Sequence, residues 1–180
     1  MTGGNGAQQL NISFASDQGD TLSGGNYADH LYGGKGIDTL AGGEGNDYLE
    51  GGAGEDTLRG DLGDDILIGG KGNDVLQGGG GNDLYIIRAG DGQDRIIDHE
   101  GSNTVVYEDA SGRRSVLGVA AFSVASQTNT WSANLSGGGA VSFTKNSPLT
   151  AFLPDGTQIV VDDYQEGDFG IQGRARRWRR

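Results

Sequence analysis

The sequence predicts an all-β protein in which a parallel β-solenoid of nonapeptide repeats is followed by an antiparallel β module. A nine-residue period runs without insertion from Gly33 to Ile86, through GGKGIDTLA, GGEGNDYLE, GGAGEDTLR, GDLGDDILI, GGKGNDVLQ and GGGGNDLYI. A fixed short period is typical of stacked coils rather than of an ordinary globular core. From about Gly101 glycine becomes rarer, and short β-type runs alternate with turn signals.

These patterns divide the chain into four segments. We expect a lead-in flank at residues 1–14, the solenoid at 15–98, a C-terminal β capping module at 99–173 and a basic tail at 174–180 that is disordered or non-native. The solenoid starts with a degenerate unit, ASDQGDTLS, and a weaker one, GGNYADHLY. After a two-residue slip it ends with AGDGQDRII. Terminal repeats of a solenoid are atypical because they cap the stack. The capping module is expected to form strands at Thr104–Tyr107, Ser115–Val119, Thr130–Leu135, Ala140–Thr144, Thr150–Leu153 and Gln158–Val161.

Within a unit, the last three residues are expected to form a strand and the first six a turn. Facing alternates along a strand, so only the eighth residue points inward. The predicted core is therefore a ladder of one side chain per unit. Its members are Leu22, Leu31, Leu40, Leu49, Leu58, Leu67, Leu76 and Tyr85.

The sixth residue of every unit is an aspartate. Two units complete a coil, so unit n stacks on unit n+2 at about 4.8 Å. This places Asp29 near Asp47, Asp38 near Asp56, Asp47 near Asp65, Asp56 near Asp74, and Asp65 near Asp83. Stacked carboxylates repel each other, and burying them unpaired is costly. A calcium ion resolves this conflict because it binds six to eight oxygens from carboxylates and backbone carbonyls.

The units resemble the calcium-binding RTX repeat of secreted bacterial proteins, whose consensus is GGxGxDxUx with U large and apolar. In that family each ion lies between two stacked turns and binds both aspartates and the carbonyls of the first four loop positions. The resemblance implies about five calcium ions between residues 24 and 86, and Asp20 with Asp38 and Asp74 with Asp94 raise the total to about seven. The implied carbonyl ligands are those of Gly24, Gly25, Asn26, Gly33, Gly34, Lys35, Gly36, Gly42, Gly43, Glu44, Gly45, Gly51, Gly52, Ala53, Gly54, Gly60, Asp61, Leu62, Gly63, Gly69, Gly70, Lys71, Gly72, Gly78, Gly79, Gly80 and Gly81.

Three loops depart from the consensus. Tyr27 replaces the fourth-position glycine, and we expect its β-carbon to strain the turn. Asp61 and Asp64 add carboxylates to one loop, where they either strengthen the local field or are solvated turn residues. Gly80 makes the loop of the last regular unit looser.

Composition narrows the function. The 180 residues carry a net charge of −12, with 36 glycines and no cysteine, which suits a hard cation and argues against nucleic acid or anionic membrane as a partner. No run of consecutive apolar residues is long enough to span a membrane. No catalytic motif such as GxSxG or HExxH is present. The periodic spacing of the aspartates indicates that they coordinate metal ions, so we expect no enzyme activity in this chain.

The sequence therefore predicts a calcium-dependent folding, stabilising and secretion module, disordered without calcium and folded with it. The resemblance implies a fragment of a large bacterial protein, similar to lipases or toxins, that is secreted by a type I system without a cleaved N-terminal signal. Expected partners are calcium, adjacent domains and the secretion machinery, and we expect a monomer. The alternative is an extracellular recognition or adhesion module that binds a glycan, a lipid or a host protein.

Overall fold

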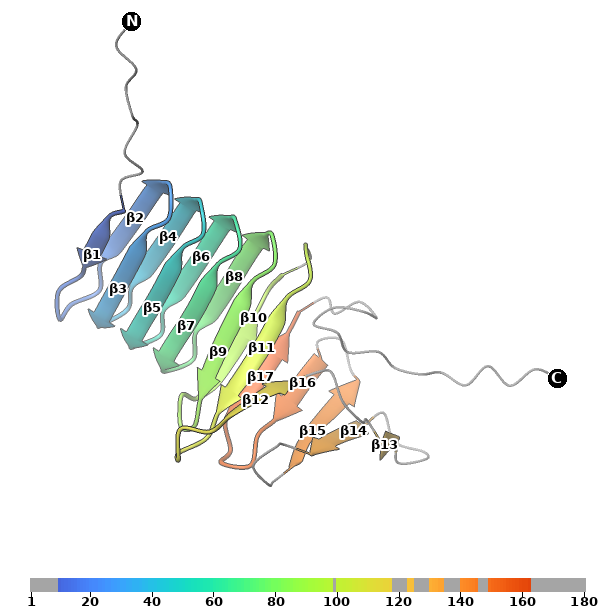
Figure 1. Ribbon diagram of the computed structural model, residues 1–180. Helices are drawn as coiled ribbons and strands as arrows, with labels where there is room; N and C mark the ends of the chain where they lie inside the picture. Colours follow the sequence, from blue (N-terminus) through green and yellow to red (C-terminus); the bar gives the residue numbers. More distant parts are fainter. Residues whose placement is uncertain are drawn as a thin grey trace, which may run out of the picture.

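The computed structural model describes residues 10–98, 100–117, 123–124, 130–134, 140–145 and 149–162 (Figure 1). Every regular element in these ranges is a β-strand, which confirms the predicted all-β class. Among these residues, no helix is long and apolar enough to cross a membrane.

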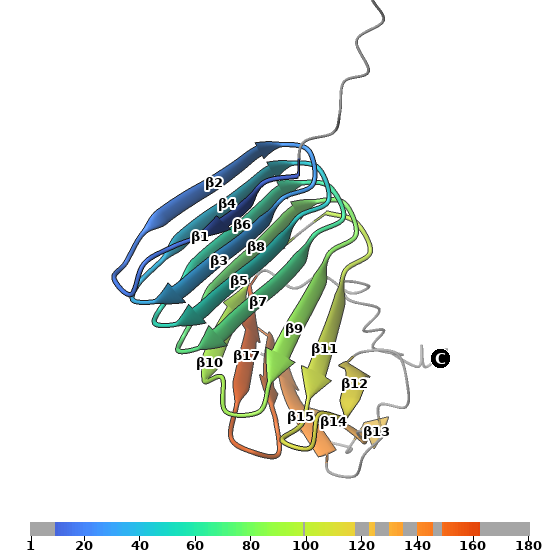
Figure 2. The ribbon, with the colours of Figure 1, turned by 60° about the vertical axis from the view of Figure 1, so that its left-hand side comes forward.

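The strands of the solenoid alternate between two walls, which face each other across the core (Figures 1 and 2). The first wall contains, in order, β1 (Ile12–Phe14), β3 (His30–Lys35), β5 (Tyr48–Ala53), β7 (Ile66–Lys71), β9 (Leu84–Arg88) and β11 (Thr104–Glu108). The second wall contains β2 (Thr21–Asn26), β4 (Thr39–Glu44), β6 (Thr57–Leu62), β8 (Val75–Gly80) and β10 (Gln93–Ile96). Each strand pairs in parallel with the next strand of its own wall, so unit n stacks on unit n+2, as the period predicts.

The register places like positions of the repeat on top of each other. Leu22 pairs with Leu40 and Leu31 with Leu49, one coil apart. The strands are longer than the predicted three residues. For example, β4 also takes in the first three positions of the following loop, and Gly43 pairs with Asp61. The glycine-rich segment therefore supplies ladder hydrogen bonds before it turns, and the turn itself is short.

The parallel ladder continues beyond the boundary at residue 98 that the sequence suggests. Ile87 and Arg88 end β9, and the offset between coils then grows by two residues, so that Ile96 pairs with Leu76 and Val105 with Tyr85. In this register residues 98–106, DHEGSNTVV, are a further, degenerate unit. Gly101, Asn103 and Val105 occupy its fourth, sixth and eighth positions.

The capping module extends both walls at the C-terminal end. On the first wall, β12 (Arg114–Leu117) folds back antiparallel on β11. On the second wall, β17 (Gln158–Val161) pairs in parallel with β10, and antiparallel pairing then follows through the earlier strands of the module. Those strands are β16 (Leu149–Phe152), β15 (Ala140–Lys145), β14 (Thr130–Asn134) and β13 (Ser123–Val124). All six predicted runs overlap a strand of this module or β11.

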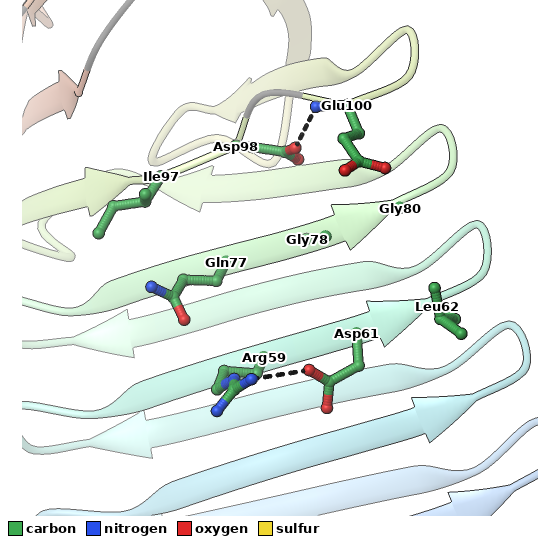
Figure 3. A pocket seen from close by; sticks show the side chains of 10 residues that line it. Arg59, Asp61, Leu62, Gln77, Gly78, Gly80, Ile97, Asp98 and Glu100 are labelled. Carbon is green, nitrogen blue, oxygen red and sulfur yellow. Dashed lines mark hydrogen bonds and ion pairs between the residues drawn. The ribbon is translucent and has the colours of Figure 1, made fainter.

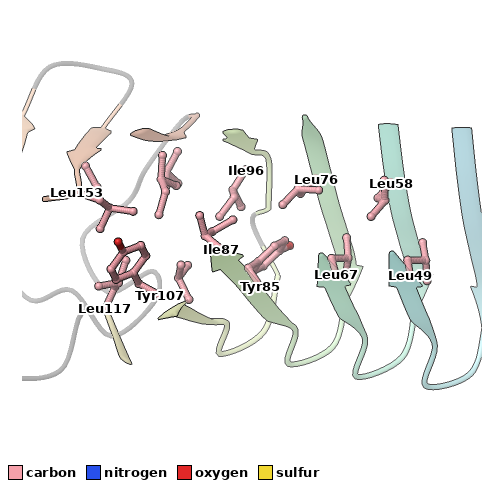
Figure 4. Packing of buried hydrophobic residues seen from close by; sticks show 14 of the residues in the cluster. Leu49, Leu58, Leu67, Leu76, Tyr85, Ile87, Ile96, Tyr107, Leu117 and Leu153 are labelled. Atoms are coloured by element: carbon pink, nitrogen blue, oxygen red, sulfur yellow. The ribbon is translucent and has the colours of Figure 1, made fainter. Parts of the chain in front are cut away.

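The core is the predicted ladder, and it widens toward the cap (Figure 4). Leu31, Leu40, Leu49, Leu58, Leu67, Leu76 and Tyr85 are fully buried, whereas Leu22 at the open end is only partly buried. Beyond Tyr85 the core gains Ile87, Ile96, Val105, Tyr107, Leu117, Leu153, Ile159 and Val161. Burial of one leucine stabilises a fold by roughly 1.5–3 kcal/mol. The repeats thus share a thin core of one side chain per unit, and the cap supplies most of the additional packing.

Glycine is favoured at the second position Gly43 for two separate reasons. Gly43 has a φ of 112°, which disfavours any residue with a β-carbon, and a β-carbon there would lie 2.0 Å from the carbonyl oxygen of Gly25 in the coil before. Gly25 itself has a φ of 108°, but a β-carbon there would meet nothing within 4 Å. A side chain at Gly25 would therefore meet backbone strain alone, whereas a side chain at Gly43 would meet the same strain and also crowd the neighbouring coil.

Alanine substitution at these two glycines measures the crowding between coils. Gly25→Ala is expected to cost about 1–2 kcal/mol, the strain of a left-handed residue. Gly43→Ala is expected to cost about 1–3 kcal/mol more, because overpacking adds to the same strain. The measurement is thermal unfolding of both variants with calcium present. Equal losses of stability would show that the coils do not press on each other at this position.

Candidate metal centres

The sixth-position aspartates lie at the ends of the loops, immediately before the inward-facing strand residues. Every one from Asp29 to Asp83 has at most 2% of its surface exposed, and Asp94 is fully buried. Burial of so many carboxylates in one small core is unusual, because charged groups are buried only when they are paired or coordinate a metal.

One oxygen of each carboxylate ties two coils together. The backbone N–H of Asp29 donates to Oδ1 of Asp47 at 2.7 Å, and that of Asp47 donates to Oδ1 of Asp65 at 2.7 Å. On the alternate units the N–H of Asp38 donates to Oδ1 of Asp56 at 2.8 Å. The same bond joins Asp20 to Asp38, Asp56 to Asp74, Asp65 to Asp83, and Asp74 to Asp94. The structure therefore brings together every pair of aspartates that the period places one coil apart.

The other oxygen has no partner. The buried Oδ2 atoms of Asp29, Asp38, Asp47, Asp56, Asp65, Asp74, Asp83 and Asp94 make no hydrogen bond to the protein. An unsatisfied buried carboxylate oxygen costs more than a neutral polar group, because the whole charge is desolvated. A recurring set of such atoms at one position of the repeat fits a cation bound at each of these loops.

The first-position glycines leave space around Oδ2. A β-carbon on Gly60 would lie 2.1 Å from Oδ2 of Asp65 and 2.6 Å from the carbonyl oxygen of Gly78, one coil further on. The same pair of oxygens borders the corresponding point at Gly24, Gly33, Gly42 and Gly51. Each site thus brings one orphaned carboxylate oxygen close to a bare glycine carbonyl of the next coil. This donor set fits a hard cation such as Ca²⁺.

Other predicted carbonyl ligands retain capacity for a cation. The third-position carbonyls of Ala53, Leu62, Lys71 and Gly80 each accept one hydrogen bond from a fourth-position N–H of the preceding coil. A carbonyl oxygen has two lone pairs, so one remains. Within the described residues, no three His, Cys, Asp or Glu side chains converge on one point, so main-chain oxygens must complete each site.

Burial shifts the titration of these carboxyl groups. It raises the pKa of Asp47 and Asp56, and it raises the pKa of Asp65 and Asp74 to about 7. The pKa of Asp94 rises to about 8 for the same reason, with a contribution from Asp74. In each case loss of hydration is the largest cause and the neighbouring aspartate adds to it. Without a cation the fold therefore keeps Asp65 and Asp74 only partly ionised near neutral pH, and a bound cation would favour their ionised forms.

The two ends of the stack differ from its middle. The carboxylate of Asp20 accepts hydrogen bonds from both the N–H and the hydroxyl of Ser16, and these bonds lower its pKa, so it lacks the orphaned oxygen of the other units. At the other end Asp94 keeps an orphaned Oδ2. The ligand roles of Asp20 and Asp94 stay predictions.

Two residues at the sixth position escape the sequence pattern because they are asparagines. Asn11 donates its N–H to Oδ1 of Asp29, and Asn103 accepts the N–H of Asp83 through its own Oδ1. The signal for Asn103 was present, because Gly101, Asn103 and Val105 lie nine residues after Gly92, Asp94 and Ile96. Counting one unit further, with Asn allowed for Asp, would have found it.

The irregular loop residues lie at the surface. Tyr27 has a φ of 88° and Asp61 a φ of 74°, so both adopt the left-handed conformation that glycine adopts in the other units. Asp61 forms an ion pair with Arg59 at 3.0 Å. Oδ1 of Asp64 accepts the N–H of Asn82 at 2.7 Å. These contacts favour the interpretation of the Asp61 and Asp64 carboxylates as turn groups rather than as charges that strengthen the field at a cation site.

Comparison with known proteins identifies a matching family of repeats. The sequence model of the RTX calcium-binding nonapeptide repeat (4 copies) matches residues 14–49, 23–58, 33–67, 59–85 and 86–109. Curated proteins include no significant match. Among solved structures, a subunit of the mannuronan C5-epimerase of Azotobacter vinelandii, determined in solution, is 21% identical over 82% of this chain and 72% of that chain. Its TM-score of 0.29 is too low to support a conclusion about the whole fold.

The repeat matches together span more than half of the chain, and they include the unit at residues 98–106. They coincide with the stacked coils and with all the aspartates that have an orphaned oxygen. The chain therefore belongs to the RTX calcium-binding nonapeptide repeat family, and its solenoid is a calcium-binding β-roll.

Proposed function

We propose that calcium binding drives the folding of this chain, which serves as a folding, stabilising and secretion module of an extracellular protein. The observation that carries the proposal is the set of eight buried Oδ2 atoms without a partner. A folded chain without cations would hold these charges at a large desolvation cost. The unfolded chain would solvate all of them, so removal of calcium favours the unfolded state.

The thin core strengthens this dependence. Most nonapeptides contribute a single fully buried apolar side chain, while their glycines lose more backbone entropy on folding than other residues would. No cysteine is available to staple the coils. Calcium ions between the loops take that role, since a ligand that binds only the folded state stabilises it by mass action.

Calcium concentration then decides the state of the chain. Extracellular calcium modules bind with a Kd of roughly 10⁻⁴–10⁻³ M. At ten times its Kd, one ion adds roughly 1.4 kcal/mol, and at submicromolar calcium it adds about nothing. Several ions acting together make a switch between an unfolded chain inside the cell and a folded chain outside. In this proposal the secretion machinery handles the unfolded form, and catalysis resides in other parts of a larger protein.

Far-ultraviolet circular dichroism tests the switch directly. The metal-stripped chain is expected to give a disordered spectrum, and millimolar Ca²⁺ is expected to produce a β spectrum with a steep, cooperative titration. Potassium chloride at the same ionic strength serves as the control, because screening of repulsion alone would also act there. A β spectrum that is indifferent to calcium would contradict the proposal.

The substitution Asp65→Asn distinguishes two effects of the orphaned charge: it destabilises the metal-free fold, and it binds calcium. The amide keeps Oδ1 as an acceptor for Asp47 and places an N–H₂ group beside the Gly78 carbonyl. Asn103 shows that an amide fits the sixth position, since its Oδ1 accepts the N–H of Asp83 while its Nδ2 donates to the carbonyl of Glu100 in its own loop at 2.7 Å. We expect less calcium bound at saturation, together with a gain of about 1–3 kcal/mol for the metal-free fold, because an unsatisfied buried group is removed.

The metal-free fold of this variant can be measured as folding induced by a stabilising osmolyte such as TMAO. Asp64→Asn is the matched control: it removes the same charge from the adjacent position at the surface and should change neither quantity. A metal-free Asp65→Asn chain that needs more osmolyte than the parent chain would show that the buried charge is not a burden.

The raised pKa values predict the dependence on pH. An unfolded aspartate titrates near pH 3.9, whereas Asp65 and Asp74 titrate at about 7 in the metal-free fold. The folded chain binds protons that the unfolded chain releases, so the metal-free fold is most stable below about pH 4 and loses stability as the pH rises through 7. Calcium requires the ionised form, so its affinity is expected to fall as the pH drops from 8 to 6.

Two titrations check these signs. The metal-stripped chain should gain β signal as the pH is lowered from 8 to 4, and the calcium concentration at the folding midpoint should be higher at pH 6 than at pH 8. A calcium midpoint that does not depend on pH would mean that the coordinating carboxylates are already ionised in the absence of metal.

A further inference from the structure

The C-terminal end of the roll contains a buried pair of carboxylates that the repeat pattern does not account for. Asp98 occupies the first position of the unit at residues 98–106, where the regular units have glycine. It has 3% of its surface exposed, and it lies next to the loop of Asp83, which has 1% exposed. Among the described residues, neither carboxylate takes part in an ion pair.

The atoms of this pair converge on one point. A β-carbon on Gly78 would lie 2.1 Å from the orphaned Oδ2 of Asp83 and 2.4 Å from the hydroxyl oxygen of Tyr85, so these two oxygens lie close together. The Tyr85 hydroxyl accepts the N–H of Gly78 at 2.7 Å and donates to Oδ2 of Asp98. Three oxygens from Asp83, Tyr85 and Asp98 thus surround the inner side of this loop.

The charges at this end match those of the regular sites. In the middle of the roll, two stacked loops contribute two sixth-position carboxylates, as Asp65 and Asp83 do. Between the loops at residues 78–83 and 98–103 the second sixth-position residue is the neutral Asn103, which only accepts the N–H of Asp83. Asp98 restores the lost negative charge from a different position of the same loop. If Asp98 only accepted the hydrogen bond of Tyr85, a neutral acceptor would do so without burying a second charge.

The site has access to solvent. Asp98 lines a surface pocket together with Glu100, Gln77 and Arg59, and the N–H of Glu100 donates to Oδ1 of Asp98 at 3.2 Å (Figure 3). Gly78 and Gly80 also line this pocket, so it reaches the loop whose inner side holds Asp83 and Tyr85. A hydrated cation can approach Asp98 through this opening, with the Glu100 carboxylate at its border.

We propose that the loops at residues 78–83 and 98–103 hold a further divalent-cation site in which Asp83 and Asp98 are the anionic ligands. The site differs from the repeated ones because its second carboxylate comes from the first position of the unit, and the Tyr85 hydroxyl orients that carboxylate. A hard cation such as Ca²⁺ suits an all-oxygen set of this kind. The inference rests on the proposed function, since it assumes that the neighbouring loops also bind calcium.

The count of bound calcium ions tests the site, by native mass spectrometry of the whole chain at saturating calcium. Asp98→Asn keeps an oxygen acceptor for the Tyr85 hydroxyl and removes the charge, so it is expected to bind one calcium ion fewer than the parent chain. Asp64→Asn removes an equal charge from a surface position and is expected to bind the full number. An Asp98→Asn chain that binds the full number with the same calcium midpoint overturns the inference.

A second measurement does not depend on the folding of a variant. Crystals of the unmodified chain grown with Tb³⁺ are expected to show an anomalous peak bonded to both Asp83 and Asp98. Filled repeat sites with no peak between these two residues overturn this inference and leave the proposed function intact. A chain that takes up no calcium or Tb³⁺ at any loop overturns the proposed function and this inference together.

Discussion

One aspartate per unit holds this fold together, and its two carboxylate oxygens have different roles. Oδ1 accepts a backbone N–H from the coil before, which fixes the spacing and register of the stack. Because that bond points the carboxylate into the gap between two loops, Oδ2 is buried there without a partner. The same side chain therefore aligns the coils and creates a buried negative charge that a cation can compensate.

Most other features of the roll follow from this constraint. The first-position glycine must lack a side chain, because Oδ2 fills the space that a β-carbon would take. Inside the stack, a fourth-position glycine such as Gly54 must also lack one, since a β-carbon there would lie 1.5 Å from the carbonyl oxygen of Gly36. Coils packed this closely leave room for only one inward side chain per unit, hence the ladder of leucines. Electrostatics between the loops and apolar contact between the walls are thus parts of one arrangement, and neither is sufficient alone.

The periodic part of this structure could be predicted from the sequence, whereas its ends could not. The stacking of Asp47 on Asp29 and the inward facing of Leu40 follow from a period of nine and from the alternation of a strand. The orphaned state of Oδ2 could not be predicted, because it depends on which oxygen accepts the neighbouring N–H. The unit containing Asn103 was missed because an amide replaces its sixth-position carboxylate and Asp98 replaces its first-position glycine. The parallel pairing of β17 with β10 joins residues far apart in the sequence, and no local pattern encodes it.

The ends of the roll show why the charge is confined to its middle. An aspartate inside the stack has a loop on each side to supply carbonyl oxygens, whereas one at an end has such a loop on one side only. At the N-terminal end Asn11 is neutral and Oδ2 of Asp20 is bonded by Ser16, so neither residue adds an unpaired buried carboxylate oxygen. At the C-terminal end the neutral Asn103 follows the last aspartate of its wall, and Ile159 pairs with Asp94 on the other wall. Asp94, which keeps an orphaned Oδ2, and Asp98 are the exceptions to this rule. Asp98 lies where a further loop, a pocket and an unpaired oxygen of Asp83 meet.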